Sequence, residues 1–139
     1  MIAQRLQTVL DNAKKRASSK QLPLDIELPY LLWLWDKQAG RCALSGRELL
    51  LATTACVAHQ DSPSLDQIVP GAGYTRKNVQ LVTTQTNLSK STLSCDEYVA
   101  LCEQVYFHSM RSGGRSKARG GELAKVTLVA ARQNEPRLA

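Results

Sequence analysis

The predicted fold rests mainly on residues 64–90, which read SLDQIVPGAGYTRKNVQLVTTQTNLSK. Two short apolar runs, at 65–69 and 79–82, flank a loop that is rich in turn-forming residues. Gly71 and Gly73 in this loop can adopt the positive φ that tight turns need. Short apolar runs on both sides of such a loop predict an antiparallel hairpin.

The hairpin is followed by a polar segment whose composition suits a helix. It carries Asn87 and Lys90, which are three residues apart and therefore lie on one helical face. A strand–loop–strand–helix unit of this kind can bring a carboxylate oxygen of Asp66 and an amide oxygen of Asn87 to one point. Oxygen ligands in an open site are what a hard divalent cation such as Mg²⁺ prefers. The stretch therefore predicts a site for one such ion.

The same stretch resembles the HNH, or His-Me finger (ββα-metal), endonuclease motif, in a form found in phage and bacteria. That form reads Ser-Leu-Asp-x-Ile-x-Pro, then Gly-Tyr, Asn-Val and Asn-x-x-Lys. The resemblance extends upstream through residues 13–17, 22–25 and 40–46, and in outline it covers residues 10–108. It implies an α+β fold, in which a small ββα-metal (HNH-like) hairpin-plus-helix unit packs with flanking helices.

By this resemblance, Asp66 and Asn87 would ligate one Mg²⁺ or Mn²⁺ that contacts the scissile phosphate and stabilises the leaving oxygen. Asn78 would brace the loop through side-chain to backbone hydrogen bonds. Active members of the family usually have a histidine, the general base, where this chain has Gln67. Glutamine can orient a water molecule but cannot take its proton, and losing a general base typically costs about 10²–10⁴-fold in rate.

His59 is the candidate for a substitute base. It precedes Asp66 by seven residues, so a straight strand would separate the two by roughly 23 Å. Only a turn at 61–63 that doubles the chain back could bring His59 to the site. Without that turn, His59 is an exposed loop histidine.

Two classes of function follow from the resemblance. The first is an HNH-like, divalent-metal-dependent DNA endonuclease, which hydrolyses phosphodiesters and is weakened by the loss of the usual base. The alternative is a catalytically degenerate HNH-fold module of phage origin that binds nucleic acid or protein. Gln67 favours the module, whereas the intact set of Asp66, Asn87 and Lys90 favours the enzyme. The residues also leave open action on RNA instead of DNA.

Positive charge gathers at both ends of the chain. Residues 1–20 carry a net charge of +4, residues 21–110 one of −3 and residues 111–139 one of +5, within a total of +6. Basic ends suit the phosphate backbone of double-stranded DNA, because contacts with phosphates give affinity that does not depend on the base sequence. The alternative is that both ends are solubilising flanks, which have the same composition. The candidate nucleic-acid contacts are Lys14, Lys15, Arg16, Arg76, Lys77, Lys90, Arg115, Lys117 and Arg119.

The charge pattern and the motif together divide the chain into three parts. We expect a basic N-terminal helix in residues 1–20, an HNH-like core domain in residues 21–110 and a basic C-terminal tail in residues 111–139. The tail could be ordered by DNA or by a protein partner.

Two further helices are predicted in the core domain. Residues 29–38 are apolar on nearly all sides, which predicts that Trp33 and Trp35 are core residues, with a surface for stacking bases as the alternative. The capping box at 94–97 opens a helix that runs to about residue 110. Apolar residues at helical spacing predict that one stripe of this helix is buried over the hairpin. The stripe consists of Tyr98, Leu101, Cys102, Val105 and Tyr106.

The composition also gives expectations about the cellular location of the protein and about a structural zinc ion. The chain has neither an apolar run long enough to cross a membrane nor the N-terminal layout of a signal peptide. We therefore expect no membrane partner and a cytoplasmic location, which for a phage protein is the cytoplasm of the bacterial host. The four cysteines are scattered without a Cys-x-x-Cys pair, so we expect buried thiols and no structural zinc.

Overall fold

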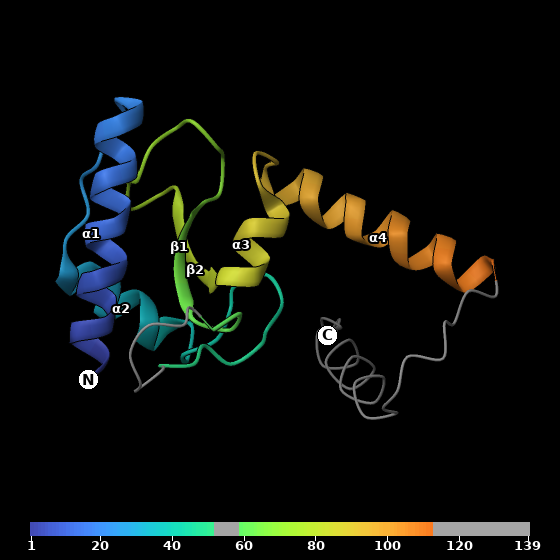
Figure 1. Ribbon diagram of the computed structural model, residues 1–139, viewed down its shortest axis with the longest axis horizontal. Coiled ribbons are helices and arrows are strands. Elements are labelled where there is room, and N and C mark those ends of the chain that lie inside the picture. Colours follow the sequence, from blue (N-terminus) through green and yellow to red (C-terminus); the bar gives the residue numbers. More distant parts are fainter. Residues whose placement is uncertain (52–58, 113–139) are drawn as a thin grey trace, which may run out of the picture. The chain divides into compact units, whose positions relative to one another are not determined.

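The computed structural model describes residues 1–51 and 59–112. The chain divides into two units, Met1–Cys102 and Glu103–Ala139. Within the described ranges, four helices and a two-stranded antiparallel sheet make a small α+β fold. The elements are α1 Ile2–Lys20, α2 Leu28–Lys37, β1 Pro63–Gln67, β2 Val79–Thr83, α3 Thr84–Lys90 and α4 Cys95–Arg111 (Figure 1).

The predicted hairpin is present as β1 and β2. The strands pair antiparallel, with Leu65 opposite Leu81 and Asp66 opposite Gln80. Leu65 and Leu81 are buried in the core, which fixes the register because a shift by one residue would turn both side chains to the other face. This register places Gln80 directly across from the carboxylate of Asp66.

α1 forms because its apolar residues recur every three or four positions and so give the helix one apolar face. The buried residues of that face are Leu6, Val9, Leu10, Ala13 and Ala17. The helix packs against α2 and β1, and it ends at Gln21, whose left-handed conformation (φ 54°) allows its N–H to bond the last turn. The basic N-terminal helix therefore belongs to the same compact unit as the hairpin.

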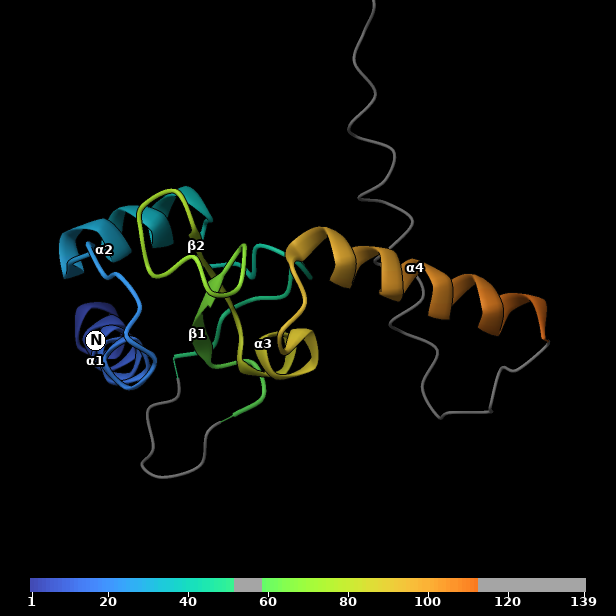
Figure 2. The same ribbon diagram turned by 90° about the horizontal axis from the view of Figure 1, so that it is seen from above.

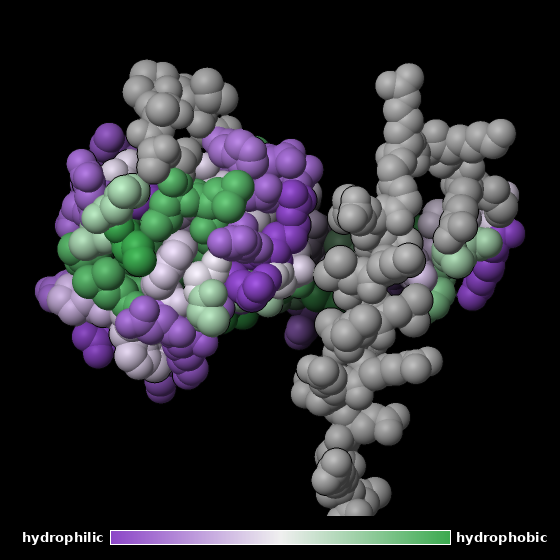
Figure 3. Space-filling model, turned by 90° about the horizontal axis from the view of Figure 1, so that it is seen from below, coloured by the Kyte–Doolittle hydropathy of each residue, from purple (hydrophilic) through white to green (hydrophobic). Residues whose placement is uncertain are grey.

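The hairpin lies between helices. β1 contacts α1 and α3, and β2 contacts α2 and α3. Seen from above, α1 and α2 lie on one side of the strands and α3 lies on the other (Figure 2). The surface of this unit also carries an apolar area that hydrophilic residues border (Figure 3).

α2 begins with Pro29 in its first turn, where the missing backbone N–H breaks no helical hydrogen bond. Leu31 and Leu34 are buried, as predicted for an apolar helix. The prediction of two core tryptophans is wrong for Trp33, whose exposed fraction is 50%. Because packing buries only the face that carries the two leucines, Trp33 meets solvent and stacks on Tyr30, with the ring centroids 5.3 Å apart.

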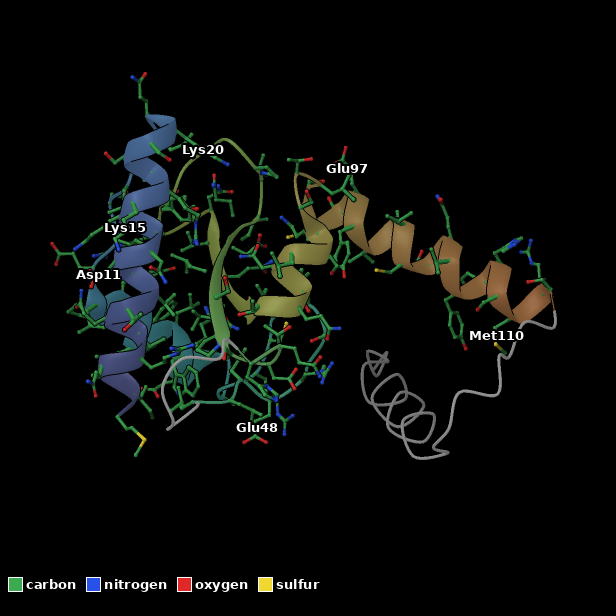
Figure 4. The ribbon with its side chains drawn as sticks, in the orientation of Figure 1. Asp11, Lys15, Lys20, Glu48, Glu97 and Met110 are labelled. Carbon is green, nitrogen blue, oxygen red and sulfur yellow. The ribbon has the colours of Figure 1, made fainter. Side chains whose placement is uncertain are left out.

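α4 begins at the predicted capping box. The N–H of Ser94 donates to the Glu97 carboxylate (2.8 Å), and the N–H of Glu97 donates to Ser94 Oγ (3.2 Å). Glu97 lies near the start of the helix and Met110 near its end (Figure 4). The prediction of a buried stripe is wrong, because no residue of α4 is buried and Val105 and Tyr106 are exposed. Helical spacing reveals an apolar face but not whether anything covers it.

The hairpin loop is held against the segment that follows α1. Leu24 forms a parallel bridge with Tyr74, and the Tyr74 N–H donates to the carbonyl of Pro23 (2.8 Å). Gly73 (φ 92°) lies so close to Pro23 that a Cβ atom would be 2.6 Å from the Pro23 carbonyl oxygen. The position requires glycine for its φ and for the space.

The predicted C-terminal tail lies outside the described residues from position 113 onward, whereas its first residue, Arg111, ends α4. The predicted contacts Arg115, Lys117 and Arg119 fall within it. Among the described helices, none has the length and apolar character needed to cross a membrane.

Candidate functional site

A cavity of about 550 Å³ opens between α1, the hairpin and α3. β1 contributes Asp66 and Gln67 to its walls, and α3 contributes Asn87 and Lys90. α1 contributes two cationic side chains, Arg16 and Lys20, the second of which is labelled at the end of the helix in Figure 4. The residues that the sequence singled out on the first strand and on the following helix therefore line one cavity.

The carboxylate of Asp66 is buried, with an exposed fraction of 4%, and both of its oxygens have partners. The ammonium of Lys90 lies 3.0 Å from Oδ1, and the Gln80 side-chain amide donates to Oδ2 (2.9 Å). Lys90 also donates to the backbone carbonyl of Gln67 (2.8 Å) and is fully buried (0% exposed). Asp66 and Lys90 thus form a buried, hydrogen-bonded ion pair. Removing one partner of such a pair usually costs about 3–5 kcal/mol, because the other charge is left buried without compensation.

Cys95 lies beside this ion pair. The Gln80 amide that bonds Asp66 also lies 3.0 Å from the Cys95 sulfur. Burial raises the pKa of the Cys95 thiol, the negative charge of Asp66 raises it further, and the nearby Lys90 ammonium opposes both effects in part. Cys95 is therefore a neutral thiol at pH 7, and the scattered cysteines of the sequence gave no signal of this position.

Gln67, which stands where the resemblance expects a base, is bonded to the hairpin loop. Its side-chain oxygen accepts the N–H groups of Gly71 (3.2 Å) and Gly73 (2.9 Å). These two hydrogen bonds direct the Gln67 side-chain oxygen toward the hairpin loop. Gln67 therefore acts in this structure as a loop brace.

Asn78 bonds the same loop from its other end. Its side-chain oxygen accepts from the N–H of Val69 (2.9 Å), and its amide nitrogen donates to the carbonyls of Val69 (3.0 Å) and Gly73 (2.8 Å). Two side chains, Gln67 and Asn78, thus fix the loop through five bonds to its backbone. Their bonding keeps the loop wall of the cavity in one conformation.

Asn87 turns its amide nitrogen toward β1. The nitrogen donates to Ser64 Oγ (2.7 Å), with a longer contact of 3.5 Å to the Leu65 carbonyl. This arrangement leaves the Asn87 side-chain oxygen as the atom that could bind a ligand. Among the residues that line the cavity, Asn87 is the one oxygen donor besides Asp66 that the resemblance assigns to a metal.

The arrangement does not fit the Mg²⁺ or Mn²⁺ that the resemblance implies. Lys90 and Gln80 already engage the two carboxylate oxygens of Asp66, and a divalent ion on this carboxylate would lie beside the Lys90 ammonium and be repelled by its charge. The Lys90 ammonium already supplies the positive charge that the carboxylate requires. In residues 1–51 and 59–112, the structure also shows no cluster of three or more His, Cys, Asp or Glu side chains that could hold a metal ion.

The remaining basic candidates lie at several places. Arg16 donates to the Tyr74 hydroxyl (2.9 Å) and to the Leu65 carbonyl (3.2 Å), which orients its guanidinium along the cavity wall. Lys14 and Lys15 are exposed on α1, and Lys77 is exposed in the hairpin loop. The sequence interpretation missed Lys20, although its spacing of four from Arg16 puts both on one helical face.

Arg76 belongs to a second surface group, in which two stacked aromatic rings lie between two cations. Its guanidinium lies 5.4 Å from the centre of the Tyr30 ring. Tyr30 stacks on Trp33, and the Lys37 ammonium lies 4.6 Å from the Trp33 ring. We call Arg76, Tyr30, Trp33 and Lys37 the aromatic ladder. The exposed Trp33 ring and the flanking charges are compatible with the alternative that the sequence left open for Trp33, a surface for stacking bases.

His59 does not line the cavity. Its side chain is half exposed, and its Nδ1 accepts from the backbone N–H of Asp61 (3.1 Å). The Asp61 carboxylate is bonded in turn by Arg47 (2.9 Å). The turn at 61–63 thus involves His59 in its own structure instead of carrying it to Asp66.

Comparison of the chain with protein-family models, with curated proteins and with solved structures found no match to any of the three.

Proposed function

We propose that this chain binds nucleic acid and holds a backbone phosphate in the cavity between α1, the hairpin and α3. The observation that carries the proposal is the charge of the cavity wall. Two cationic side chains, Arg16 and Lys20, line it, and its single carboxylate, that of Asp66, is neutralised by the buried Lys90. Guanidinium and ammonium groups are the side chains that bind phosphate most strongly.

The neighbouring surface fits a nucleic-acid backbone. Lys14 and Lys15 are exposed on α1 outside the cavity, because helical geometry turns them about 200° and 100° around the helix from Arg16; they add positive charge to the same helix. Contacts of this kind give affinity that falls steeply with salt and does not depend on base sequence. The aromatic ladder adds the exposed Trp33 ring, on which an unpaired base could stack in place of the Lys37 ammonium.

Two features favour binding without hydrolysis. Gln67 has no group that can accept a proton near neutral pH, and its side-chain oxygen is committed to the loop. Asp66 is neutralised by Lys90 instead of being open to a metal. The function that this geometry supports best is therefore a nucleic-acid-binding module built on an HNH-like unit.

Metal-dependent hydrolysis of DNA is the second candidate. The observation in its favour is that Asp66 and Asn87 line the same cavity as Arg16 and Lys20, where a scissile phosphate could lie. For this function, Lys90 would have to leave Asp66. Nicking of supercoiled plasmid separates the two candidates. Cleavage in Mg²⁺ or Mn²⁺ that disappears with Asp66→Asn supports the enzyme, and binding without cleavage supports the module.

The binding proposal is tested with fluorescence anisotropy of a labelled DNA duplex at several salt concentrations. We expect Lys20→Glu to weaken binding by about tenfold or more. Arg41→Glu is the matched control, because Arg41 is exposed and undergoes the same change of charge but does not line the cavity. Circular dichroism checks that both variants fold. The proposal would be refuted if Lys20→Glu and Arg41→Glu lost the same amount of DNA affinity, or if the wild type did not bind DNA at low salt.

A further inference from the structure

We infer that the Lys90 ammonium occupies a latent divalent-cation site and keeps that site closed. The inference rests on the proposed function, since it explains how a cavity of this type could hold a phosphate without hydrolysing it. Lys90 would then serve as the built-in cation of Asp66. The chain would bind nucleic acid without any metal.

The atoms around the ammonium are those that a hard metal ion would choose. Nζ of Lys90 contacts the Asp66 carboxylate oxygen at 3.0 Å and the Gln67 carbonyl oxygen at 2.8 Å. Carboxylate and backbone carbonyl oxygens are standard ligands of hard divalent cations. Lys90 therefore lies at a position lined by oxygen atoms that is suited to a cation in general.

Lys90 and a metal ion cannot both occupy this position. Mg²⁺ binds oxygen ligands at about 2.0–2.1 Å. An ion on Oδ1 of Asp66 would thus lie against an ammonium that is 3.0 Å from the same atom, and the two positive charges would repel. Because the Lys90 side chain is fully buried against these oxygen atoms, a metal ion could reach Oδ1 only if that side chain left its position.

The second oxygen of Asp66 offers no easier entry. Gln80 donates to Oδ2 from the opposite strand, and the pairing of β1 with β2 fixes that contact. A neutral amide repels a metal far less than an ammonium does, so Lys90 is the main barrier. Removing its charge should expose an oxygen site made of Asp66 and the Gln67 carbonyl, with Asn87 on the same cavity wall.

The test measures Mn²⁺ binding by electron paramagnetic resonance and by thermal shift, on the full chain and without nucleic acid. Lys90→Met removes the ammonium and its charge and keeps an unbranched side chain that is one atom shorter. The matched control is Asp66→Asn combined with Lys90→Met, which removes the carboxylate as well. We expect Mn²⁺ to bind Lys90→Met at least about tenfold more tightly than the wild type or the control, and to raise the melting temperature of Lys90→Met alone.

Two outcomes would overturn the inference. The first is a saturable, micromolar Mn²⁺ site in the wild type that Asp66→Asn abolishes. The second is a folded Lys90→Met that binds Mn²⁺ no better than the control. If Lys90→Met is unfolded without metal, folding on addition of Mn²⁺ supports the inference; if it stays unfolded, the wild-type titration decides. DNA binding by the wild type in a chelator is measured separately, so failure of the proposed function is distinguishable from failure of this inference.

Discussion

The buried pair of Asp66 and Lys90 allows a quantitative prediction about stability in the absence of metal. Lys90→Met leaves the Asp66 carboxylate at 4% exposure with only the amide of Gln80 as a partner. A buried charge that loses its partner destabilises a protein by about 3–5 kcal/mol. Small domains have a free energy of unfolding of about 5–15 kcal/mol, so the single variant should lose a large part of the total.

Removing both charges should be much less harmful than removing one. In Asp66→Asn with Lys90→Met, the asparagine can still accept from Gln80, and no ion remains in the core. Pairs replaced by neutral groups of similar size are often as stable as the original. We therefore expect the double variant to regain most of the stability that Lys90→Met loses.

Urea unfolding followed by far-ultraviolet circular dichroism in a chelator measures both quantities, with the wild type and the two single variants completing a double-mutant cycle. A loss below about 1 kcal/mol in Lys90→Met, the range of exposed ion pairs, would refute the reasoning. So would a double variant that is no more stable than Lys90→Met. Either result would mean that the pair is open to solvent or is not formed.

Four further predictions concern the loop, a thiol, a helix cap and the aromatic ladder. Gly73→Ala should destabilise the chain by more than the roughly 1–2 kcal/mol of a left-handed residue, because its Cβ would also meet the Pro23 carbonyl at 2.6 Å; chemical denaturation measures the loss. Because burial raises the pKa of Cys95 above its usual 9.0, labelling of this thiol by iodoacetamide, followed by mass spectrometry, should have its half-maximal rate above that pH. The N–H and hydroxyl of Ser94 lower the pKa of Glu97 below its usual 4.5. Because the pKa of Glu97 is lower in the folded state than in the unfolded state, the cap stabilises α4 fully at a pH above the unfolded pKa. This stabilisation is lost as the pH falls through the folded pKa. Helix content, measured by circular dichroism, should therefore drop in that pH range, and it should drop less in Glu97→Gln. Trp33→Ala should weaken binding of single-stranded DNA by about 1–3 kcal/mol, measured by anisotropy, and no change would remove the aromatic ladder from the binding surface.

Local patterns in the sequence were sufficient to predict the main elements. The hairpin follows from two apolar runs around glycines, and the start of α4 follows from Ser94 and Glu97. Each of these signals depends on residues a few positions apart. The same is true of α1, whose buried face can be read from its spacing.

The errors concern contacts that spacing does not determine. Trp33 and the stripe of α4 have the composition of core residues, but whether they are buried depends on which other element covers them. Lys90 shows the opposite case. The sequence made it a candidate nucleic-acid contact, and the structure buries it on Asp66, a residue 24 positions away. Only the antiparallel pairing of the strands and the return of α3 bring these two residues together.

The roles of Gln67 and Lys90 depend on each other through the hairpin loop. The Gln67 side chain fixes the loop, and its backbone carbonyl accepts from Lys90. A histidine at position 67 would have one acceptor nitrogen in its neutral form, which could not both bond two loop N–H groups and take a proton from water. A base at this position would thus need another brace for the loop, and a metal on Asp66 would need another place for Lys90. A histidine at position 67 would leave Lys90 on Asp66, and removal of Lys90 would leave position 67 without a base. Neither change alone should therefore convert this cavity into a hydrolytic site.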